Sequence, residues 1–395
     1  MKLQNTESNT ISIILAADDH YAQHLGVTIC SILENNSDVD IYIIDGGITP
    51  ENKERFQRLS EKYSARIKFL SIDPKMYDGF SLGAHFSPAA YYRLSIPSIL
   101  PKNMGRVLYL DCDMVVIANL RELWTVDLGS NYVGAVSDFG MMELFSGFLF
   151  ESELEMNEEK FKKIFLDATT KYNRKIATFN TLDIPKISFN MVDLEKITAF
   201  ACSPEVELEI LDSHGVLTLE KRNEKIRVYR LDGSFTKRLG LPRDANYFNS
   251  GMLLINLNKW RENDIGRKTM QYIAQNQSNA KFFDQDALNV VLQGLWLSLP
   301  ERFNTQCNVN IVEKPDTVVV HYVSVFKPWY WYSKFAYSEH YQKYLAKTPW
   351  SGVKRPFDGR DLGYIKFMAK QMMPSPVNKL IHIIKNSYFT KIKNR

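Results

Sequence analysis

Two aspartates one residue apart, Asp111 and Asp113, interrupt the apolar run VLYLDCDMVV at 107–116. In an extended chain, residues i and i+2 point to the same side, so both carboxylates would face one spot where a buried strand reaches the surface. Carboxylates held that close resist joint ionisation unless a cation lies between them. The pair therefore indicates a cation site, and the alternative is a solvated turn with two incidental acids.

A parallel sheet would position this pair. Apolar strand-like runs alternate with helical stretches in the first part of the chain, which predicts an α/β fold with right-handed crossovers. The expected strands are 12–16, 39–45, 66–73, 107–110 and 132–138, and the expected helices are 24–35, 51–63 and a stretch within 87–100. Ligands of such sheets bind beyond the carboxyl ends of the strands. The pair falls there, together with Asp18 and Asp138. No G-x-G-x-x-G follows the first strand, which disfavours a dinucleotide site.

The pattern changes between 140 and 245. Residues 151–175 have a helical pattern, and three segments within 206–233 alternate with period two between short turns, which predicts a small antiparallel meander. We interpret this region as an insertion carried by the α/β core. The core resumes over 246–260, 282–294 and 318–324.

Composition excludes few classes of protein. A chain of 395 residues, 45% hydrophobic and 24% charged, is ordinary for a globular protein with one large catalytic domain or two domains. Its four cysteines are widely spaced without a C-x-x-C pair, which indicates neither zinc nor disulfides and suits a reducing compartment. The polar start of the chain lacks a signal-peptide core, and no apolar run has membrane-spanning length, so we expect a cytoplasmic protein.

The net charge of +4 hides an asymmetry. From Val353 onward, ten Lys/Arg stand against two Asp, a charge of +8, which leaves −4 for the first 352 residues. A mildly acidic body disfavours nucleic acid as a partner. Apolar residues in 377–395 approximate helical spacing between lysines, which is typical of a basic amphipathic helix on an anionic membrane surface. The alternative is a terminal helix packed on its own domain.

Six strings of the sequence, in order from about 11 to 330 and outside 140–245, resemble glycosyltransferase family 8, especially the bacterial lipopolysaccharide α-galactosyl- and α-glucosyltransferases. They are AADDHYAQHLGVTICSILENN, YYRL, VLYLDCDMVV, FNSGMLLINLNKWR, DQDALN and HYVSVFKPW. The resemblance implies a Rossmann-like nucleotide-diphospho-sugar transferase fold, called GT-A, with a mixed, mostly parallel sheet. It also implies a retaining transfer from a nucleotide sugar.

The family's metal site maps onto Asp111, Asp113 and His321. Two carboxylates and one imidazole suit Mn²⁺, with Mg²⁺ as the alternative. Taken alone, His321 reads more simply as a structural histidine at the end of a strand. The metal would neutralise charge on the departing UDP.

The resemblance also assigns the nucleotide end of the donor site. Uridine contacts map onto Ala16, Asp18 and His20, although Asp18 alone could simply cap the following helix. Lys327 maps onto the diphosphate. The family normally has glycine where this chain has Ser324, and a glycine lets the backbone approach the phosphate or sugar closely.

The positions that surround the donor sugar in the family are Arg93, Asn249, Ser250, Asp284 and Gln285. Carboxylate, amide and guanidinium groups suit the hydroxyls of a hexose. An amide is a poor nucleophile, so we favour a front-face mechanism. A double displacement through Gln285, Asp138 or Asp284 is the alternative. For Asp284 and Asp286, the simpler reading is an exposed helix start, where acids complement the helix dipole.

We divide the chain into a nucleotide-sugar-binding core at 1–139, an insertion at 140–245 that shapes the acceptor side, the rest of the catalytic core at 246–345 and a basic amphipathic region at 346–395. The aromatic run 329–337 is either core packing or a stacking surface for acceptor sugars.

The expected function is transfer of galactose or glucose from UDP-galactose or UDP-glucose to a saccharide or lipid-linked saccharide, on the inner face of the cytoplasmic membrane. A nucleotidyltransferase is disfavoured by the absence of a glycine-rich phosphate loop. A non-catalytic sugar-nucleotide or glycan-binding module and a self-glycosylating initiator are the remaining alternatives.

Overall fold

Buried apolar runs bounded by turn residues form the strands of the protein at nearly the expected positions. The computed structural model describes residues 10–77, 79–80, 88–138, 146–153, 178–181, 184–187, 208–212, 215–222, 225–231, 238–242, 245–277, 282–307, 313–323, 327–330 and 335–353. Ser324, most of the helical stretch expected over 151–175 and the basic region from 354 onward lie outside these residues.

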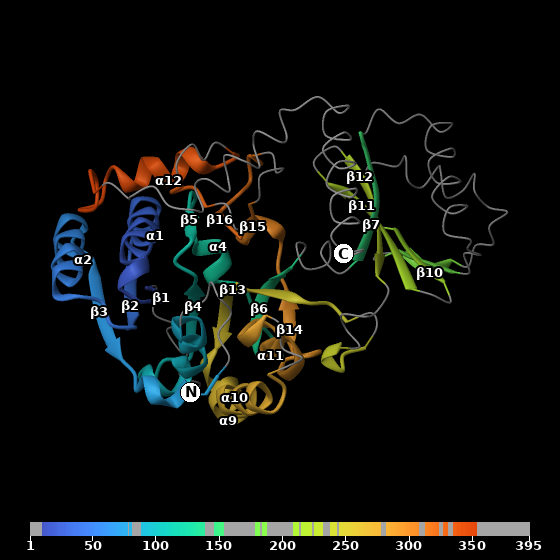
Figure 1. The fold of residues 1–395 in the computed structure, drawn as a ribbon, viewed down its shortest axis with the longest axis horizontal. Coiled ribbons are helices and arrows are strands. Elements are labelled where there is room, and N and C mark those ends of the chain that lie inside the picture. Colours follow the sequence, from blue (N-terminus) through green and yellow to red (C-terminus); the bar gives the residue numbers. More distant parts are fainter. Residues whose placement is uncertain are drawn as a thin grey trace, which may run out of the picture.

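Seven strands form the central sheet, in the order β14-β6-β13-β4-β1-β2-β3 (Figure 1). They are β1 (Ile11–Ala17), β2 (Val39–Asp45), β3 (Arg66–Ser71), β4 (Arg106–Leu110), β6 (Val133–Ser137), β13 (Phe248–Asn256) and β14 (Trp296–Ser298). β13 runs antiparallel to both its neighbours, and the other adjacent pairs are parallel. The mixed, mostly parallel sheet is therefore confirmed.

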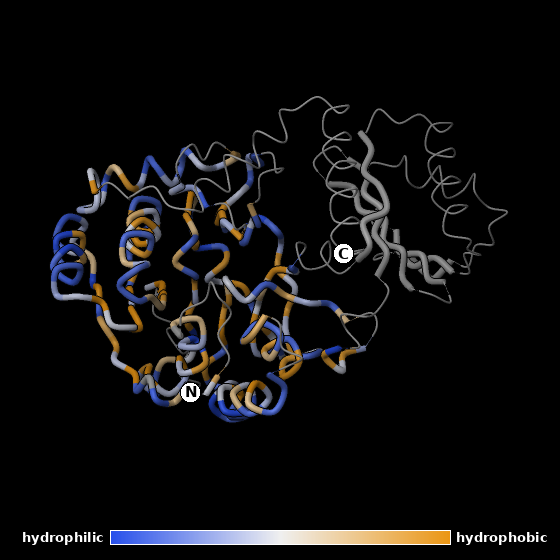
Figure 2. Tube along the Cα trace, viewed as in Figure 1, coloured by the Kyte–Doolittle hydropathy of each residue, from blue (hydrophilic) through white to orange (hydrophobic). Residues whose placement is uncertain are grey.

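Both faces of this sheet are covered. In β4, Leu108 and Leu110 enter one hydrophobic cluster, and Val107 and Tyr109 enter another, as side chains alternate between the two faces of a strand. The first face is covered by α1 (Ala22–Asn35), α2 (Pro50–Tyr63) and α12 (Ser338–Leu345). The second is covered by η3 (Pro88–Ser95), α3 (Ile96–Ile99), α9 (Leu257–Glu262), α10 (Ile265–Gln275) and α11 (Phe283–Val291). Figure 2 shows hydrophobic residues along the strands and hydrophilic residues on the outer turns of the helices.

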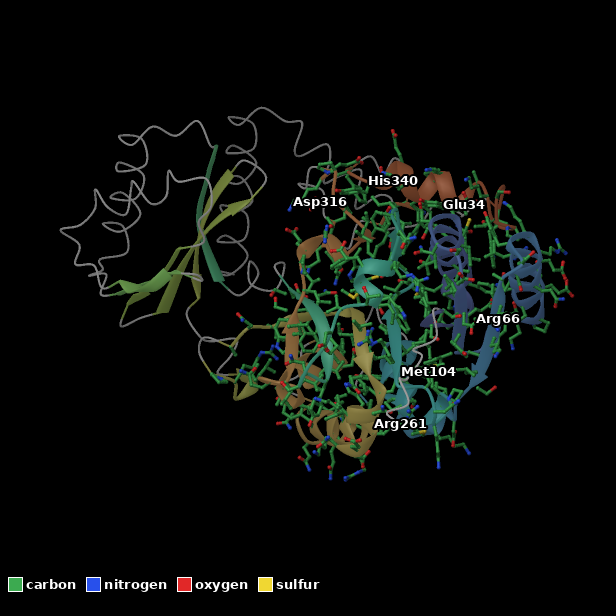
Figure 3. All side chains as sticks on the ribbon, turned by 180° about the vertical axis from the view of Figure 1, so that it is seen from behind. Glu34, Arg66, Met104, Arg261, Asp316 and His340 are labelled. Carbon is green, nitrogen blue, oxygen red and sulfur yellow. The ribbon has the colours of Figure 1, made fainter. Side chains whose placement is uncertain are left out.

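Arg261 of α9 forms hydrogen bonds with the backbone of the segment that leads into β4. Its Nε donates to Pro97 O at 2.9 Å and its Nη1 donates to Met104 O at 2.7 Å. Figure 3 shows Arg261 and Met104 close together at this end of the sheet. One guanidinium thus ties two separate backbone segments together just before the strand that carries the acidic pair at its other end.

A small sheet continues the acidic segment. It contains β5 (Met114–Val116), β16 (Val319–His321) and β15 (Thr305–Gln306), in the order β15-β16-β5. Short elements complete the core: η1 (Asp19–Tyr21), η2 (Pro74–Tyr77), α4 (Arg121–Trp124) and η5 (Glu301–Phe303). Among the described residues, no helix combines the length and apolarity needed to cross a membrane.

The expected meander is present. β10 (Leu208–Asp212), β11 (Gly215–Arg222) and β12 (Lys225–Leu231) pair antiparallel in sequence order. They belong to a separate six-stranded sheet with β7 (Ser146–Glu153), β8 (Thr178–Thr181) and β9 (Ile184–Ile187), in the order β7-β12-β11-β10-β8-β9. Residues 151–153 are the end of β7, so the helix expected from 151 is wrong at its start.

Candidate active site

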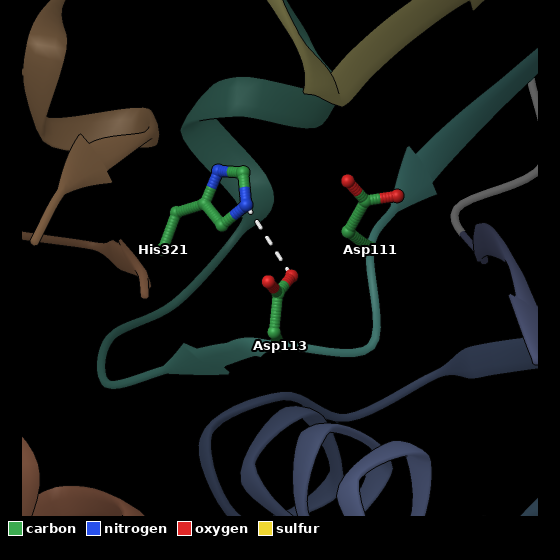
Figure 4. Close-up of side chains that lie close together, drawn as sticks. All are labelled: Asp111, Asp113 and His321. Carbon is green, nitrogen blue, oxygen red and sulfur yellow. Dashed lines mark ion pairs between the residues drawn. The ribbon is translucent and has the colours of Figure 1, made fainter. Parts of the chain in front are cut away.

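Asp111 and Asp113 lie in the turn between β4 and β5, so the expectation that strand pleating brings them together is wrong. The chain leaves the seven-stranded sheet at Leu110 and enters the small sheet at Met114. β16 pairs with β5 and ends at His321. One atom each from Asp111, Asp113 and His321 lies within 4.8 Å of the others (Figure 4). A turn between two sheets therefore assembles the cluster.

Asp113 has two cationic or potentially cationic neighbours. Lys327 Nζ lies 2.8 Å from its Oδ2, and His321 Nε2 lies 3.3 Å from its Oδ1. Burial opposes ionisation of this carboxyl, but Lys327 and His321 outweigh burial and lower the pKa of Asp113 well below its usual range. Asp113 is therefore a carboxylate at neutral pH.

Asp111 is held from the opposite side. Its Oδ1 accepts hydrogen bonds from Tyr109 Oη at 2.5 Å and from Arg93 Nη2 at 2.9 Å. Tyr109 lies two residues earlier, and the Arg93 guanidinium lies 4.6 Å from its ring centroid. Burial and the charge of Asp113 raise the pKa of Asp111, and Arg93 opposes the rise. Two acids of opposite pKa shift thus share one turn.

Arg93 connects the acidic turn to α11. Its Nε lies 3.0 Å from Asp284 Oδ2, and its Nη1 donates to Ser250 O at 2.5 Å. Its side chain is 7% exposed. Burial raises the pKa of Asp284 to about 6 even though Arg93 opposes the rise. The guanidinium makes its contacts with protein groups, and through them it orients Asp111 and Asp284.

The start of α11 is not exposed. Asp284 and Asp286 are 6% and 0% exposed, so the reading of these acids as a solvated helix start is wrong. Asp286 accepts from Tyr247 Oη at 2.7 Å and from Arg238 Nη1 at 3.2 Å. Asp284 faces the Arg93 guanidinium, whereas Asp286 anchors the chain before β13.

Gln285 and Asp138 meet at the carboxyl end of β6. Gln285 Nε2 donates to Asp138 Oδ2 at 2.9 Å, and Gln285 Oε1 accepts from Ser250 N at 2.9 Å. Asn249 Nδ2 also donates to Asp138 Oδ2, at 3.0 Å. Because β13 is antiparallel, its amino end reaches the edge where the parallel strands end. The structure therefore brings Asp138, Asn249, Ser250 and Gln285 together.

Two further residues of the site were missed by sequence reasoning. Asn304 is fully buried and bonds both Asn249 Oδ1, at 2.9 Å, and His321 Nδ1, at 3.1 Å. Gly251 lies so close that an added Cβ would be 2.3 Å from His321 Cε1. A glycine inside an apolar strand is a signal for such a close approach, whereas nothing local marks Asn304.

The residues expected to contact uridine lie at the end of β1. Asp18 accepts from Tyr21 N at 3.2 Å, so it does cap η1. Cys112 Sγ lies 3.6 Å from Ala16 O, which joins β1 to the acidic turn. Burial raises the pKa of Cys112, and Asp113, Asp111 and Asp18 raise it further, which places Asp18 electrostatically near the cluster. His20 is exposed.

The described part of the aromatic run packs inward. Trp329 stacks on His24, with ring centroids 3.7 Å apart, and His24 Nδ1 lies 2.6 Å from Tyr341 Oη. Tyr330 and Tyr337 are 8% and 1% exposed. Core packing is thus what these rings do, and residues 331–334 lie outside the described range.

The donor set of the cluster suits a divalent cation. Two carboxylates and one imidazole nitrogen match the ligands that Mn²⁺ and similar ions take in proteins. His321 Nε2 and Asp113 Oδ1 face each other at 3.3 Å (Figure 4). Both atoms offer lone pairs when the imidazole is neutral, so a cation between or beside them relieves their repulsion.

The chain has the fold of the GT-A glycosyltransferases. The crystal structure of galactosyltransferase LgtC in complex with donor and acceptor sugar analogues has a TM-score of 0.58 and 22% identity, and the match covers 88% of this chain and 98% of that one. The bifunctional glycosyltransferase WbbM has a TM-score of 0.55 and 22% identity, with 88% of this chain and 52% of that one covered. At this identity, the likeness establishes the fold.

Residues 12–331 match the model of Glycosyl transferase family 8, so the chain belongs to that family. General stress protein A of Bacillus subtilis is 26% identical, over 87% of this chain and 96% of the relative. Lipopolysaccharide 1,3-galactosyltransferase of Salmonella typhimurium is 21% identical, over 91% and 86%. Lipopolysaccharide 1,2-glucosyltransferase of Escherichia coli K12 is 21% identical, over 93% and 86%. The resemblance drawn from the sequence is confirmed, and the protein is a glycosyltransferase.

Proposed function

We propose that the protein transfers a hexose from UDP-galactose or UDP-glucose to a saccharide acceptor of a cell-surface glycan, such as lipopolysaccharide or lipooligosaccharide, with retention at the anomeric carbon. The names of the two lipopolysaccharide glycosyltransferases among its relatives support the choice of sugars and acceptor. The observation that carries the proposal is the cluster of Asp111, Asp113 and His321 at the ligand-binding edge of the sheet.

Asp111, Asp113 and His321 would hold Mn²⁺, with Mg²⁺ as the alternative. A divalent ion there supplies charge neutralisation for the diphosphate leaving group. Lys327, already paired with Asp113, adds a positive charge beside the cluster. The uridine end of the donor would lie along Ala16, Asp18 and His20, and the backbone near Ser324 would contact the diphosphate or sugar.

The hexose would lie between α11 and the amino end of β13. Asp284 accepts hydrogen bonds from sugar hydroxyls, and Asn249 and Ser250 border the same space. Arg93 keeps Asp284 and Asp111 in place through contacts of 3.0 and 2.9 Å. Arg93 therefore serves the donor site by holding its acids.

A front-face route fits these contacts better than a double displacement. Gln285 uses its oxygen on Ser250 N and its nitrogen on Asp138. Asp138 Oδ2 already accepts from two amides. An atom that accepts buried hydrogen bonds is a weaker nucleophile, so the acceptor hydroxyl attacks on the face that UDP leaves. The departing phosphate takes the proton of that hydroxyl.

UDP release from a panel of UDP-sugars, measured with Mn²⁺, with Mg²⁺ and with chelator, tests the proposal. We expect release from UDP-galactose or UDP-glucose that needs the metal. No binding or hydrolysis of any UDP-sugar under any metal condition would contradict catalysis and favour a non-catalytic binding module. A mass increase of the protein itself, seen by intact-mass analysis, would favour a self-glycosylating initiator.

The other assignments concern location. The insertion 140–245 interrupts the core between two strands of the donor site, β6 and β13, which supports a role on the acceptor side. The basic, amphipathic sequence of 377–395 supports attachment to the inner face of the cytoplasmic membrane. Lipid-linked saccharides at that surface would then be within reach of the site.

A further inference from the structure

A chain of side-chain hydrogen bonds connects Asp138 to His321, the histidine of the acidic cluster. Asn249 Nδ2 donates to Asp138 Oδ2 at 3.0 Å, and Asn304 Nδ2 donates to Asn249 Oδ1 at 2.9 Å. Asn304 Oδ1 lies 3.1 Å from His321 Nδ1. All four side chains are buried, with exposed fractions between 0% and 6%. We call these four residues the amide relay.

The direction of the amide relay follows from groups that can only donate or only accept. Gly251 N–H donates to Asn249 Oδ1 at 3.0 Å. A backbone N–H has no acceptor, so this contact assigns the oxygen of Asn249, and the carboxylate of Asp138 independently assigns its nitrogen. Asn304 must then present its nitrogen to Asn249 and its oxygen to His321.

We infer that the amide relay fixes the tautomer of His321, with Asn304 as the positioning residue. An amide oxygen only accepts, so His321 Nδ1 carries a proton, and Nε2 is the nitrogen that holds the lone pair in the neutral ring. Nε2 is the atom that faces Asp113 Oδ1 at 3.3 Å. Asn304 thereby prepares Nε2 as a ligand, in the way that a hydrogen bond to the second nitrogen sets other metal-binding histidines. The inference deepens the proposed metal site and rests on it.

The backbone of β13 restricts the position of the His321 ring. A Cβ on Gly251 would lie 2.3 Å from His321 Cε1 and 2.9 Å from Nδ1. The imidazole is therefore pressed against the backbone between Asn304 and Asp113. Asp138 belongs to the sugar side of the proposed site and His321 to the metal side, so the amide relay joins the two.

The first test needs no substitution in the amide relay. Metal-free protein with ¹⁵N-labelled histidine is studied by long-range ¹H–¹⁵N NMR, and the His321 signals are assigned by their loss in His321→Gln. We expect Nδ1 to show the shift of a protonated ring nitrogen throughout the pH range of the native fold. An unprotonated Nδ1 would overturn the inference. This outcome needs neither metal nor donor, so it does not depend on glycosyl transfer.

The second test distinguishes a role of Asn304 at the metal site from a general effect on stability. Mn²⁺ alone is the probe, and electron paramagnetic resonance measures its binding. Asn304→Leu removes both bonds and frees Nε2 to take the proton, so we expect Mn²⁺ affinity to fall by about 10–100-fold. Asn304→Asp keeps an acceptor for Nδ1 but turns an oxygen toward Asn249 Oδ1, so we expect Mn²⁺ affinity to fall less than in Asn304→Leu. Both variants are compared with Asn36→Leu, which removes a partly buried amide that bonds Leu120 N at 2.7 Å and Ile32 O at 3.0 Å.

Wild-type Mn²⁺ affinity in Asn304→Leu, an equal loss in Asn36→Leu, or a loss in Asn304→Asp as large as in Asn304→Leu would each overturn the role of Asn304. Absence of Mn²⁺ binding in the wild-type protein would instead contradict the metal site of the proposed function. The NMR result would still decide the tautomer if either variant failed to fold.

Discussion

Lys327 Nζ lies 2.8 Å from Asp113 Oδ2, although the two residues are 214 positions apart in the chain. The contact joins the segment that follows β16 to the turn that follows β4. It places a lysine ammonium beside the carboxylate that we assign to the metal. Residues from the first and the last part of the catalytic core therefore meet beside the proposed metal site.

Asp113→Asn removes a carboxylate of the cluster with little change in shape. We expect activity to fall by at least about 10³-fold, because a divalent ion contributes several kcal/mol to leaving-group stabilisation. UDP release measures the loss, and near-UV circular dichroism checks that the fold is kept. Substantial turnover in this variant would refute the metal assignment. Asp264→Asn, at an exposed position, is the matched control.

Lys327→Met keeps the length of the side chain and removes its charge. We expect the donor KM to rise by about 10–100-fold, since a hydrogen bond to a charged group contributes about 1.5–3 kcal/mol. Lys327→Arg should recover part of the loss. Isothermal titration with UDP follows the same change without turnover. An unchanged affinity for UDP in Lys327→Met would place the lysine in a purely structural role.

Gly251→Ala adds a methyl group where the His321 ring and the Asp111 carboxylate leave no space. We expect Mn²⁺ affinity to fall, together with about 1–3 kcal/mol of stability. Gly134→Ala is the control, because its added Cβ would meet the side chains of Leu128 and Leu299 at 3.0 Å, and neither residue belongs to the cluster. Equal effects of the two substitutions on Mn²⁺ binding would contradict the close fit at Gly251.

The pH dependence of stability reports on Asp284. Burial raises its pKa to about 6 from an ordinary value of 3.8, so between these values the native state binds more protons than the unfolded state. Stability from this group is present below about pH 4 and is lost as pH rises through 6. The unfolding free energy of wild type relative to Asp284→Asn should fall by on the order of 3 kcal/mol between pH 4 and 7. The unfolding free energies of the two proteins are measured by urea titration at each pH. If they change in parallel with pH, Asp284 has an ordinary pKa in the native state.

Removal of 377–395 tests the membrane assignment. The full chain should bind vesicles that contain anionic lipid, and less so at high salt, because basic residues near such a surface each contribute about 1 kcal/mol. The shortened chain should stay in the supernatant on sedimentation and keep its turnover of soluble acceptors. Equal binding of the two chains to vesicles would contradict the assignment of 377–395 as the membrane-binding segment.

The strands could be predicted well from the sequence because their apolar runs are bounded by turn residues. Val39–Asp45 forms a strand over the expected residues, and Ile11–Ala17 exceeds the expected 12–16 by one residue at each end. The residues expected at the carboxyl ends of strands are there for the same reason, since chain order and sheet direction determine that edge.

The contacts inside the site were harder to predict. The closeness of Asp111 and Asp113 arises from a turn between two sheets, and a local pattern of alternation does not encode which sheet a chain enters next. Asn304 acquires its role from pairing between segments that are far apart in sequence. Its neighbours in the chain carry no motif that distinguishes it from any buried asparagine.

Asp138 N donates to Tyr247 O at 2.8 Å, so the chain leaves the core and returns to it at adjacent points. The 108 residues between them thus form a closed excursion whose ends are tied by the β6–β13 pairing. Arg238 within this segment is bonded to Asp286 of α11, so only the residues before it could be exchanged without disturbing the chain that enters β13. Under the role proposed for the insertion, acceptor preference would change by exchange of that part, while the residues proposed to hold the donor stay the same.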